Sequence, residues 1–440
     1  MKALDSKNSL EKIIARFDRY HPARIDLTLE RIIRLLDELN SPHKDLPRVI
    51  HVAGTNGKGS TISFLRSIYE AAGLVVSTYT SPHLIGFNER YVLEGDIISE
   101  SDLCAILKEV EAINNGEPIT QFEILTAAAF LSLSRTNSDV VLIETGLGGR
   151  FDATNVVDNP IATIITPVSM DHEMFLGSNI NSIAGEKAAI QKSGAKSIIA
   201  PQSEEVMKVI ERQGIEVGAK IYQAGVDYEF EKIKNGFSYT SKMLSISIPR
   251  MSLVGPHQII NAATAVACVE QCEQIQIDEK HIINGISNAS WSGRLELLSD
   301  GILKRCLPQG WDVWLDAGHN EAAGKALCDS LSEIRLGHKK PLHIFFGMLE
   351  DKNPAVFLKS LVKHAASLTA VPLVDEPRGH IPEDLLALLR DEGIEAISET
   401  SIEEALNNLA KKSHLATILI CGSHSLVGRI IRLNTPISPR

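Results

Sequence analysis

A glycine-rich loop between an apolar strand and an amphipathic helix constrains this chain more than any other segment. The segment reads His51-Val52-Ala53-Gly54-Thr55-Asn56-Gly57-Lys58-Gly59-Ser60-Thr61. The apolar run 48–53 predicts a strand, and apolar residues then recur at helical spacing until Gly73. Such a loop turns backbone N–H groups onto an anion, the helix N-terminus adds positive charge, and a lysine neutralises the outer phosphates. We therefore expect a phosphate cradle formed by Thr55, Asn56, Gly57, Lys58, Gly59 and Ser60.

The cradle differs in two details from the common P-loop pattern. Val52 stands where the first glycine of that pattern would be, and Gly59 follows Lys58, so that the first hydroxyl comes at Ser60. The alternative interpretation is an ordinary glycine-rich turn. The order of strand, glycines, lysine and helix favours nucleotide binding instead.

Length and composition limit the class of protein. A chain of 440 residues exceeds what one core supports and indicates two domains. The formal net charge of -11, with no long run of Lys or Arg, disfavours a nucleic-acid partner. The six cysteines form no CxxC pair and are expected to be reduced core thiols. The start lacks the apolar core of a signal peptide, and no apolar run approaches the roughly 18 residues that span a bilayer, so we expect a cytoplasmic location without membrane contact.

The order of predicted elements indicates an α/β fold with two domains. Strands alternate with helices up to residue 222 and again after Gly293, which is typical of mainly parallel sheets. We place an ATP-binding domain at 1–295 and a smaller Rossmann-like α/β domain at 296–440. Residues 222–250 alternate apolar and polar side chains and predict an antiparallel β segment. The later strands are expected at 313–317, 342–347, 368–373 and 417–422, and helices between them at 322–336 and 355–366.

Three side chains outside the cradle fall just past the carboxyl ends of predicted parallel strands. They are Ser81, Glu144 and His172. Strand ends of an open sheet line one crevice, so these residues are expected to converge there. Glu144 ends the buried run 140–144, a Walker-B-like arrangement for holding Mg²⁺. For His172 alone, a hydrogen-bonded structural histidine is as plausible as a metal ligand.

Other candidate residues carry weaker signals. Lys187 reads from its pattern alone as a surface charge on a helix, and Asn261 lies on an alanine-rich helix face. Arg294 and Asp316 flank the predicted domain boundary, from where the second domain could close on a nucleotide. His319 occupies the loop after Asp316.

Together these segments resemble one known family. In chain order, the segments are Gly54–Ser60, Ser81-Pro82-His83-Leu84, Phe122-Glu123, Glu144 with 146–155, Asp171-His172, Glu186-Lys187 and 316–320. Their order resembles that of the dihydrofolate synthase/folylpolyglutamate synthase family, within the Mur ligase superfamily. Similarity continues through 346–348, 351–352, 376–379 and 421–423, and the 144–155 stretch is very specific.

The resemblance implies an ATP-dependent amide ligase with a P-loop Mur-ligase-type ATPase domain. ATP would phosphorylate a carboxylate of dihydropteroate or of a folyl glutamate, and the amine of L-glutamate would attack the acyl phosphate. Position by position, it implies catalytic roles for Lys58, Glu144, His172 and Lys187. The implied ligands of two Mg²⁺ ions are Ser81, Glu144, His172 and Lys187, with Lys187 carbamylated.

The resemblance also implies the nucleotide and acceptor contacts. Beyond the cradle, the implied ATP contacts are Asn261, Arg294, Asp316 and His319. The implied dihydropteroate pocket consists of Asp26, Leu27, Thr28, Thr120, Gln121, Phe122, Glu123, Phe151, Asp152 and Ala153. We expect a monomer.

Three alternatives remain open at this point. A folylpolyglutamate synthase without the first activity need not hold dihydropteroate near Asp26. A cell-wall Mur ligase would need an N-terminal domain, for which the cradle near residue 54 leaves little room. A non-catalytic nucleotide switch would bind ATP without a second domain or an acceptor pocket.

Overall fold

The computed structural model describes residues 2–21, 25–335, 340–374 and 376–435, which form two compact units. The first unit holds the chain up to Ser252 together with Ile259–Ala289, and the second holds Leu253–Gln258 and the chain from Ser290 onward. The boundary predicted after residue 295 therefore lies a few residues too late. Leu295 is buried in the core of the second unit, and Val254 packs against the same core.

An eight-stranded sheet organises the first unit, with strand order β4-β3-β2-β5-β1-β6-β7-β8. The strands are β1 Arg48–Ala53, β2 Val76–Tyr79, β3 Tyr91–Leu93, β4 Asp96–Ile97, β5 Val140–Glu144, β6 Ala162–Ile165, β7 Lys196–Ile199 and β8 Lys220–Gln223. Only the pairs β2–β3 and β3–β4 are antiparallel, and all other neighbouring strands of this sheet are parallel. The central strands are buried on both faces, as their continuous apolar sequences require.

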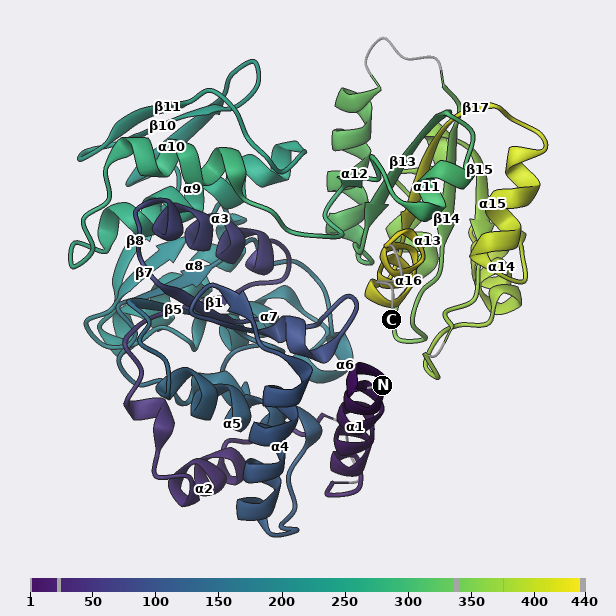
Figure 1. Ribbon diagram of the computed structural model, residues 1–440. Helices are drawn as coiled ribbons and strands as arrows, with labels where there is room; N and C mark the ends of the chain where they lie inside the picture. The colour runs from purple at the N-terminus through teal and green to yellow at the C-terminus, as the bar shows by residue number, and fades with distance from the viewer. Residues whose placement is uncertain (1, 22–24, 336–339, 375, 436–440) are drawn as a thin grey trace. The chain divides into compact units, whose positions relative to one another are not determined.

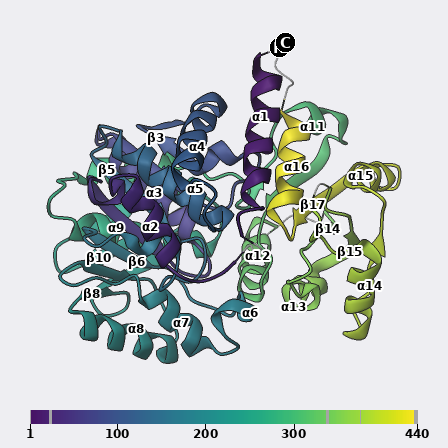
Figure 2. The same cartoon turned by 90° about the horizontal axis from the view of Figure 1, so that it is seen from below.

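Helices cover both faces of this sheet. They are α1 Lys2–Phe17, α2 Glu30–Glu38, α3 Lys58–Ala71, α4 Glu100–Asn114, α5 Gln121–Ser134, α6 Glu173–Leu176, α7 Ile180–Ala188, α8 Glu204–Val217, α9 Pro256–Gln271 and α10 Glu279–Asn288, with 3-10 turns η1 Pro42–Lys44, η2 Phe87–Arg90 and η3 Ala153–Val156. Figure 1 shows α3, α9 and α10 over one face and α4 and α5 over the other. The helices α7 and α8 lie side by side and pack on β6 and β7 (Figure 2).

The antiparallel segment predicted at 222–250 is confirmed as a three-stranded sheet. It consists of β9 Tyr228–Lys232, β10 Phe237–Ser241 and β11 Ser245–Ile248. The ring of Tyr228 stacks between Tyr222 and Tyr239, and the carboxylate of Glu270 accepts hydrogen bonds from both of those phenols. These contacts hold the small sheet to β8 and α9.

The second unit is a six-stranded sheet of order β12-β13-β17-β14-β15-β16. Its strands are β12 Glu296–Leu297, β13 Gly310–Asp316, β14 Leu342–Phe346, β15 Ala365–Ala370, β16 Ile397–Ser398 and β17 Leu415–Cys421, and only β12 is antiparallel. Its helices are α11 Ile302–Cys306, α12 Glu321–Ile334, α13 Pro354–Leu358, α14 Pro382–Asp391, α15 Ile402–Ala410 and α16 His424–Asn434, with η4 Val362–His364. The predicted α/β fold is confirmed in both units.

Two element predictions in the second unit are wrong in their bounds. The helix predicted at 355–366 ends at Leu358, and the strand predicted at 368–373 runs from Ala365 to Ala370. The residues 365–367 are two alanines and a serine, which carry little strand propensity, yet Ala365 and Ser367 pair with β14. Pro372 cannot donate to a ladder, which is why the strand ends before it.

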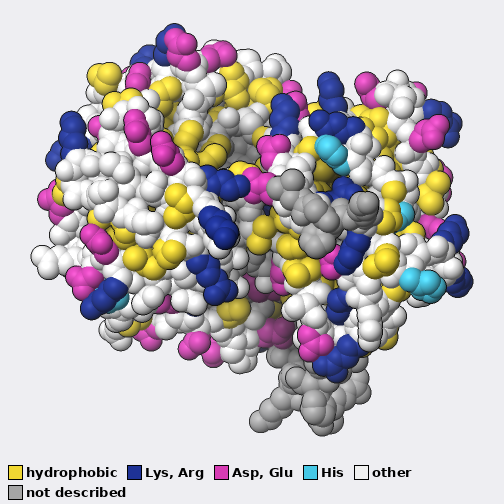
Figure 3. Space-filling view, turned by 90° about the horizontal axis from the view of Figure 1, so that it is seen from above, with side chains coloured by type: hydrophobic (Ala, Val, Ile, Leu, Met, Phe, Trp, Pro, Cys, Tyr) yellow, Lys and Arg dark blue, Asp and Glu magenta, His cyan; other side chains and the backbone are white. Residues whose placement is uncertain are grey.

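The thiols and surface charges complete this description. All six cysteines are free, and five are buried as expected, whereas Cys306 is exposed. Lys and Arg side chains are interspersed with Asp and Glu side chains on the face drawn in Figure 3. Among the described residues, no helix is both long enough and apolar enough to cross a membrane.

Candidate functional site

The glycine-rich loop lies between β1 and α3, as predicted, and α3 begins at Lys58, so the cradle residues Gly59 and Ser60 belong to its first turn. Gly54 and Gly57 have φ of 147° and 93°. A Cβ at Gly54 would overlap Thr166, and one at Gly57 would overlap the side-chain amide of Asn261. Both positions therefore require glycine for conformation and for space. The backbone N–H groups of Thr55 and Asn56 donate to Pro167 O, which fixes the start of the loop.

Lys58 lies at the N-terminus of α3 with its side chain folded over the loop. Its Nζ donates to the carbonyl oxygens of Gly54 and Thr55 at 3.2 and 3.4 Å, and it lies 3.9 Å from Glu144 Oε1. A lysine in this position can move from loop carbonyls to a phosphate without leaving the site.

Glu144 and Ser81 meet at the carboxyl ends of β5 and β2. The backbone N–H of Ser81 donates to Glu144 Oε2 at 3.2 Å, and Glu144 is only 5% exposed. Within the described ranges, no group of three or more His, Cys, Asp or Glu side chains is placed to hold a metal ion. Mg²⁺ needs no such group, because it keeps several waters and binds through one or two carboxylates and substrate phosphates. The single carboxylate beside a hydroxyl and the cradle fits that ion.

His172 and Lys187 approach the same region from the segment after β6. His172 has φ of 52° and precedes α6, where its backbone N–H bonds to Asp171 Oδ1. Lys187 lies on α7 with its Nζ 3.0 Å from Gly54 O. Burial, and then the charge of Lys58, lower the pKa of Lys187 to about 7. The side chain is 4% exposed, so the surface charge that its pattern suggested is a buried amine at the cradle.

A pocket of about 250 Å³ opens beside Ser81 and His172. Most of the predicted acceptor residues line it, together with five residues that were not predicted as part of the acceptor pocket. The predicted residues on its wall are Asp26, Leu27, Thr28, Thr120, Phe122, Glu123, Phe151, Asp152 and Ala153, and the additional ones are Ile25, Pro82, Arg90, Gly146 and Leu147. Gln121 is not among the lining residues, because its side chain donates to Asp18 Oδ1 at 3.0 Å.

Arg31, another residue that the sequence analysis missed, ties the pocket segment 25–28 to α5. Its guanidinium donates to Asp26 Oδ2 at 2.8 Å and to Glu123 Oε2 at 3.0 Å. Glu123 is 3% exposed and also accepts from the backbone N–H and hydroxyl of Thr120. Arg31 and Glu123 are 92 positions apart, so only the fold reveals the pair.

Phe122 and Asp152 shape the remaining wall. The ring of Phe122 lies so close to Gly146 that a Cβ there would overlap it. Asp152 Oδ2 accepts from Leu147 N, while Oδ1 accepts from the N–H and hydroxyl of Thr154. Burial raises the pKa of Asp152, and these hydrogen bonds oppose the rise. The loop 146–155 therefore folds around this carboxylate.

The remaining predicted nucleotide contacts lie in both units. Asn261 is buried on α9 in the first unit, beside Gly57. In the second unit, the carboxylate of Asp316 accepts hydrogen bonds from Leu295 N and Gly318 N. Leu295 directly follows Arg294 in the chain. His319 lies 6.1 Å, ring centre to ring centre, from His424, which sequence reasoning did not select. The two histidines lie near each other because they follow β13 and β17, which are adjacent in the sheet.

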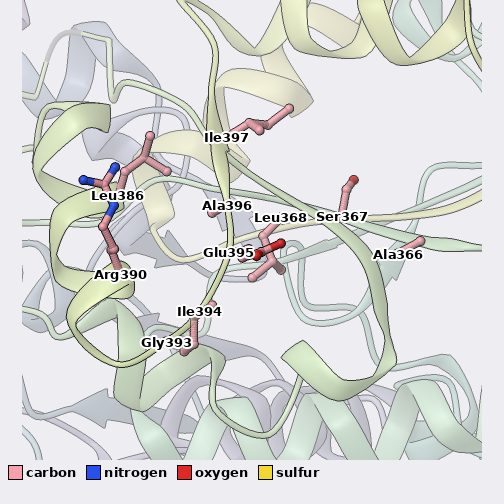
Figure 4. Close-up of a pocket in the computed structure, with 10 residues that line it drawn as sticks. All are labelled: Ala366, Ser367, Leu368, Leu386, Arg390, Gly393, Ile394, Glu395, Ala396 and Ile397. Carbon is pink, nitrogen blue, oxygen red and sulfur yellow. The ribbon is translucent and has the colours of Figure 1, made fainter.

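Larger hollows elsewhere contain none of the predicted site residues. One of about 670 Å³ lies at the edge of the second unit's sheet, lined by β15, α14 and the segment before β16. Figure 4 shows Arg390 and Glu395 as its charged residues. Another, of about 680 Å³, is lined by residues of α8, β9 and the loops beside them. Size alone would therefore have selected the wrong place.

Comparisons with known proteins converge on one group. The Mur ligase middle domain matches residues 52–269, and the Mur ligase glutamate ligase domain matches residues 293–424. A dihydrofolate synthase/folylpolyglutamate synthase of Bacillus subtilis is 36% identical over 375 residues, covering 81% of this chain and 83% of its own.

Two solved structures have a similar fold and contain bound ligands. E. coli FolC in complex with DHPP and ADP has a TM-score of 0.86 at 30% identity, covering 96% of this chain and 97% of its own. The bifunctional folylpolyglutamate synthase/dihydrofolate synthase with Mn, AMPPNP and L-glutamate bound has a TM-score of 0.83 at 29% identity, covering 95% and 97%.

Proposed function

Because this chain belongs to the dihydrofolate synthase/folylpolyglutamate synthase family of the Mur ligases, we propose that it uses ATP to join L-glutamate to dihydropteroate and to the γ-carboxylate of folates. It is an ATP-dependent ligase that works with a divalent metal ion, in keeping with the ligands of its structural relatives.

The observation that carries the proposal is a shared wall between cradle and pocket. Ser81 and His172 line the pocket, and Ser81 bonds to Glu144, which lies 3.9 Å from Lys58. An acceptor in the pocket would therefore place its carboxylate next to a phosphate held in the cradle. Proximity of this kind is a large part of catalysis in phosphoryl transfer.

The chemistry follows from what each group can do. A carboxylate resists attack by an amine until one of its oxygens becomes a leaving group. The carboxylate oxygen attacks the γ-phosphorus and ADP leaves. The glutamate amine then attacks the acyl carbon, phosphate leaves, and the nitrogen loses a proton. Lys58 and the cradle N–H groups stabilise the negative charge on the transferred group. Bound Mg²⁺ would supply further charge compensation there.

The individual roles remain part of this proposal. Ser81 and Glu144 would hold one Mg²⁺, and His172 with a carbamylated Lys187 would hold the second. The burial of the Lys187 amine beside another cation supports its conversion to an anion. The nucleotide contacts would be the cradle with Asn261, Arg294, Asp316 and His319, and the acceptor would occupy the pocket without Gln121.

Phosphate release from ATP tests the function. Purified protein is incubated with ATP, Mg²⁺ and L-glutamate, with dihydropteroate or tetrahydrofolate as acceptor, and each component is omitted in turn. We expect glutamate-dependent release with both acceptors. Release with tetrahydrofolate alone would reduce the function to polyglutamation, and no glutamate-dependent release would refute the ligase.

We also propose a monomer that works in the cytoplasm. Light scattering on the eluting protein at assay concentration should give a mass near the chain's 48.0 kDa. A mass twice as large would contradict the monomer.

A further inference from the structure

One buried histidine of β1 has no part in the chemistry proposed above. His51 lies three residues before Gly54, it is 0% exposed, and its register neighbours on the adjacent strands are Ile143 and Thr163. A histidine without charge partners in a strand core is unfavourable unless its nitrogens find hydrogen bonds.

His51 finds one such bond, to the loop that forms the pocket wall. Its Nε2 lies 2.8 Å from Thr154 Oγ1, 103 positions along the chain. The Thr154 hydroxyl donates in turn to Asp152 Oδ1 at 2.5 Å. Since that hydroxyl has one hydrogen, Nε2 of His51 must be the donor, and Nδ1 is left as a buried acceptor without a partner among the described residues.

The chain of bonds ends at the carboxylate that organises the pocket. Asp152 is 2% exposed, and its oxygens accept from Leu147 N and Thr154 N besides the hydroxyl. Its two neighbours Phe151 and Ala153 and the residue Leu147 all line the pocket. A fixed Asp152 carboxylate therefore also holds the backbone of the loop at Leu147 and at Thr154.

The geometry points to His51 as a positioning residue: acting through Thr154, it holds the Asp152 carboxylate, and with it the loop 146–155, in the shape that accepts dihydropteroate. This inference rests on the proposed function for the identity of the acceptor. It assigns His51 no contact with substrate, and it makes Asp152 an organiser of the loop as much as a ligand.

Burial keeps the imidazole of His51 in its neutral form. It lowers the pKa of His51 to about 3, so the imidazole is neutral at any pH at which the enzyme would be assayed. The charged groups that face the chain of bonds are Asp152 itself, Lys192, which acts on His51, and Lys187, which acts on Asp152. Lys192 Nζ donates to Asn155 O in the same loop.

Kinetics of paired variants test the inference. Thr154→Val and His51→Leu each remove one hydrogen bond and should raise KM for dihydropteroate roughly five- to tenfold. KM for ATP and kcat at saturating acceptor should change less than about twofold. Thr154→Ser and His51→Gln, which keep a hydroxyl and an N–H donor, should restore most of the affinity. Thr163→Val is the matched control, because it removes a buried hydroxyl beside His51 that has no partner among the described residues.

Amide hydrogen exchange supplies a readout that does not depend on activity. The loop peptide covering 146–155 should exchange faster in Thr154→Val than in the wild type or in Thr163→Val. Unchanged exchange together with an unchanged KM for dihydropteroate would overturn the inference, as would an equal rise in KM for ATP. A wild type without dihydropteroate-dependent phosphate release would refute the proposed function instead, and the exchange result would still decide whether His51 positions the loop.

Discussion

At the scale of single residues, the two charges at the cradle should dominate turnover. Lys58→Ala and Glu144→Ala are each expected to lower kcat by about two to three orders of magnitude, since each removes a group placed at the developing charge. Phosphate release measures the effect, and far-UV circular dichroism should show an intact fold. Lys280→Ala, at an exposed lysine of α10, is the control. A variant at either cradle residue with near-normal turnover would remove that residue from the mechanism.

Lys187 gives a second prediction at this scale. Its amine is expected to carry a carbamate, so Lys187→Ala should lose most activity, and intact mass measured under native conditions should fall when carbon dioxide is removed. Short carboxylic acids added to Lys187→Ala should return part of the turnover, because they replace the missing anion. Full activity of the variant, with a mass indifferent to carbon dioxide, would contradict this.

His51 predicts a dependence of stability on pH. Its pKa is lowered to about 3 in the folded chain, so the unfolded state binds more protons between that value and the ordinary 6.5. Stability from this residue is therefore present above about pH 6.5 and is lost as the pH falls towards 3. Between pH 6.5 and pH 4, the melting temperature should fall less for His51→Gln than for the wild type. Parallel curves for the two proteins would argue against a neutral buried imidazole.

At the scale of elements, the two ends of α3 offer a matched pair of glycines. Gly57 and Gly73 both have positive φ, but a Cβ at Gly73 would meet nothing within 4 Å. Alanine at either position should cost about 1–2 kcal/mol of stability from backbone strain. Only Gly57→Ala should also raise KM for ATP, by roughly tenfold or more, because the overlap with Asn261 displaces the cradle. Equal ATP affinity in the two variants would mean that the loop tolerates the shift.

The helix α2 carries the other element-scale prediction. Arg31→Met removes the bridge between Asp26 and the buried Glu123 and should raise KM for dihydropteroate several-fold, with a loss of roughly 1–3 kcal/mol of stability. Arg34→Met is the control on the same helix, since Arg34 pairs with Glu38 and Asn114, away from the pocket. Equal KM values in the two variants would show that Arg31 does not order the acceptor segment.

Elements with strong local patterns were predictable from sequence, and pairings across the chain were not. The bounds of β1 and β5 agree with prediction because both strands are mainly apolar, β1 ends where the glycine-rich loop begins, and β5 ends at Glu144. The meeting of Ser81, Glu144 and the cradle followed from the rule that parallel strand ends share an edge. Arg31 and His51 escaped notice because their partners lie 92 and 103 positions away. The family resemblance implies a place for Gln121 in the pocket, but its side chain donates to Asp18 instead.

At the scale of the whole molecule, each unit has its own parallel sheet and its own core. In the second unit, the carboxylate of Asp316 at the end of β13 accepts a hydrogen bond from Leu295 N and so holds the turn that contains Arg294. Asp316→Asn should therefore weaken ATP binding about as much as Arg294→Ala, while leaving KM for dihydropteroate unchanged. Titration of each variant with ATP by calorimetry measures this, and wild-type affinity in both would remove these two residues from nucleotide binding.

The two hydrogen bonds that link His51, Thr154 and Asp152 also limit how these positions can change in evolution. An apolar residue in place of Thr154 would leave the Nε2–H of His51 without its acceptor in the core, and an apolar residue in place of His51 or Asp152 would remove one of the two partners of the Thr154 hydroxyl. Lineages that diverge from this chain should therefore inherit the trio intact or replace it in concert. A relative that keeps the histidine but has lost the hydroxyl would be the natural place to look for a changed choice of acceptor.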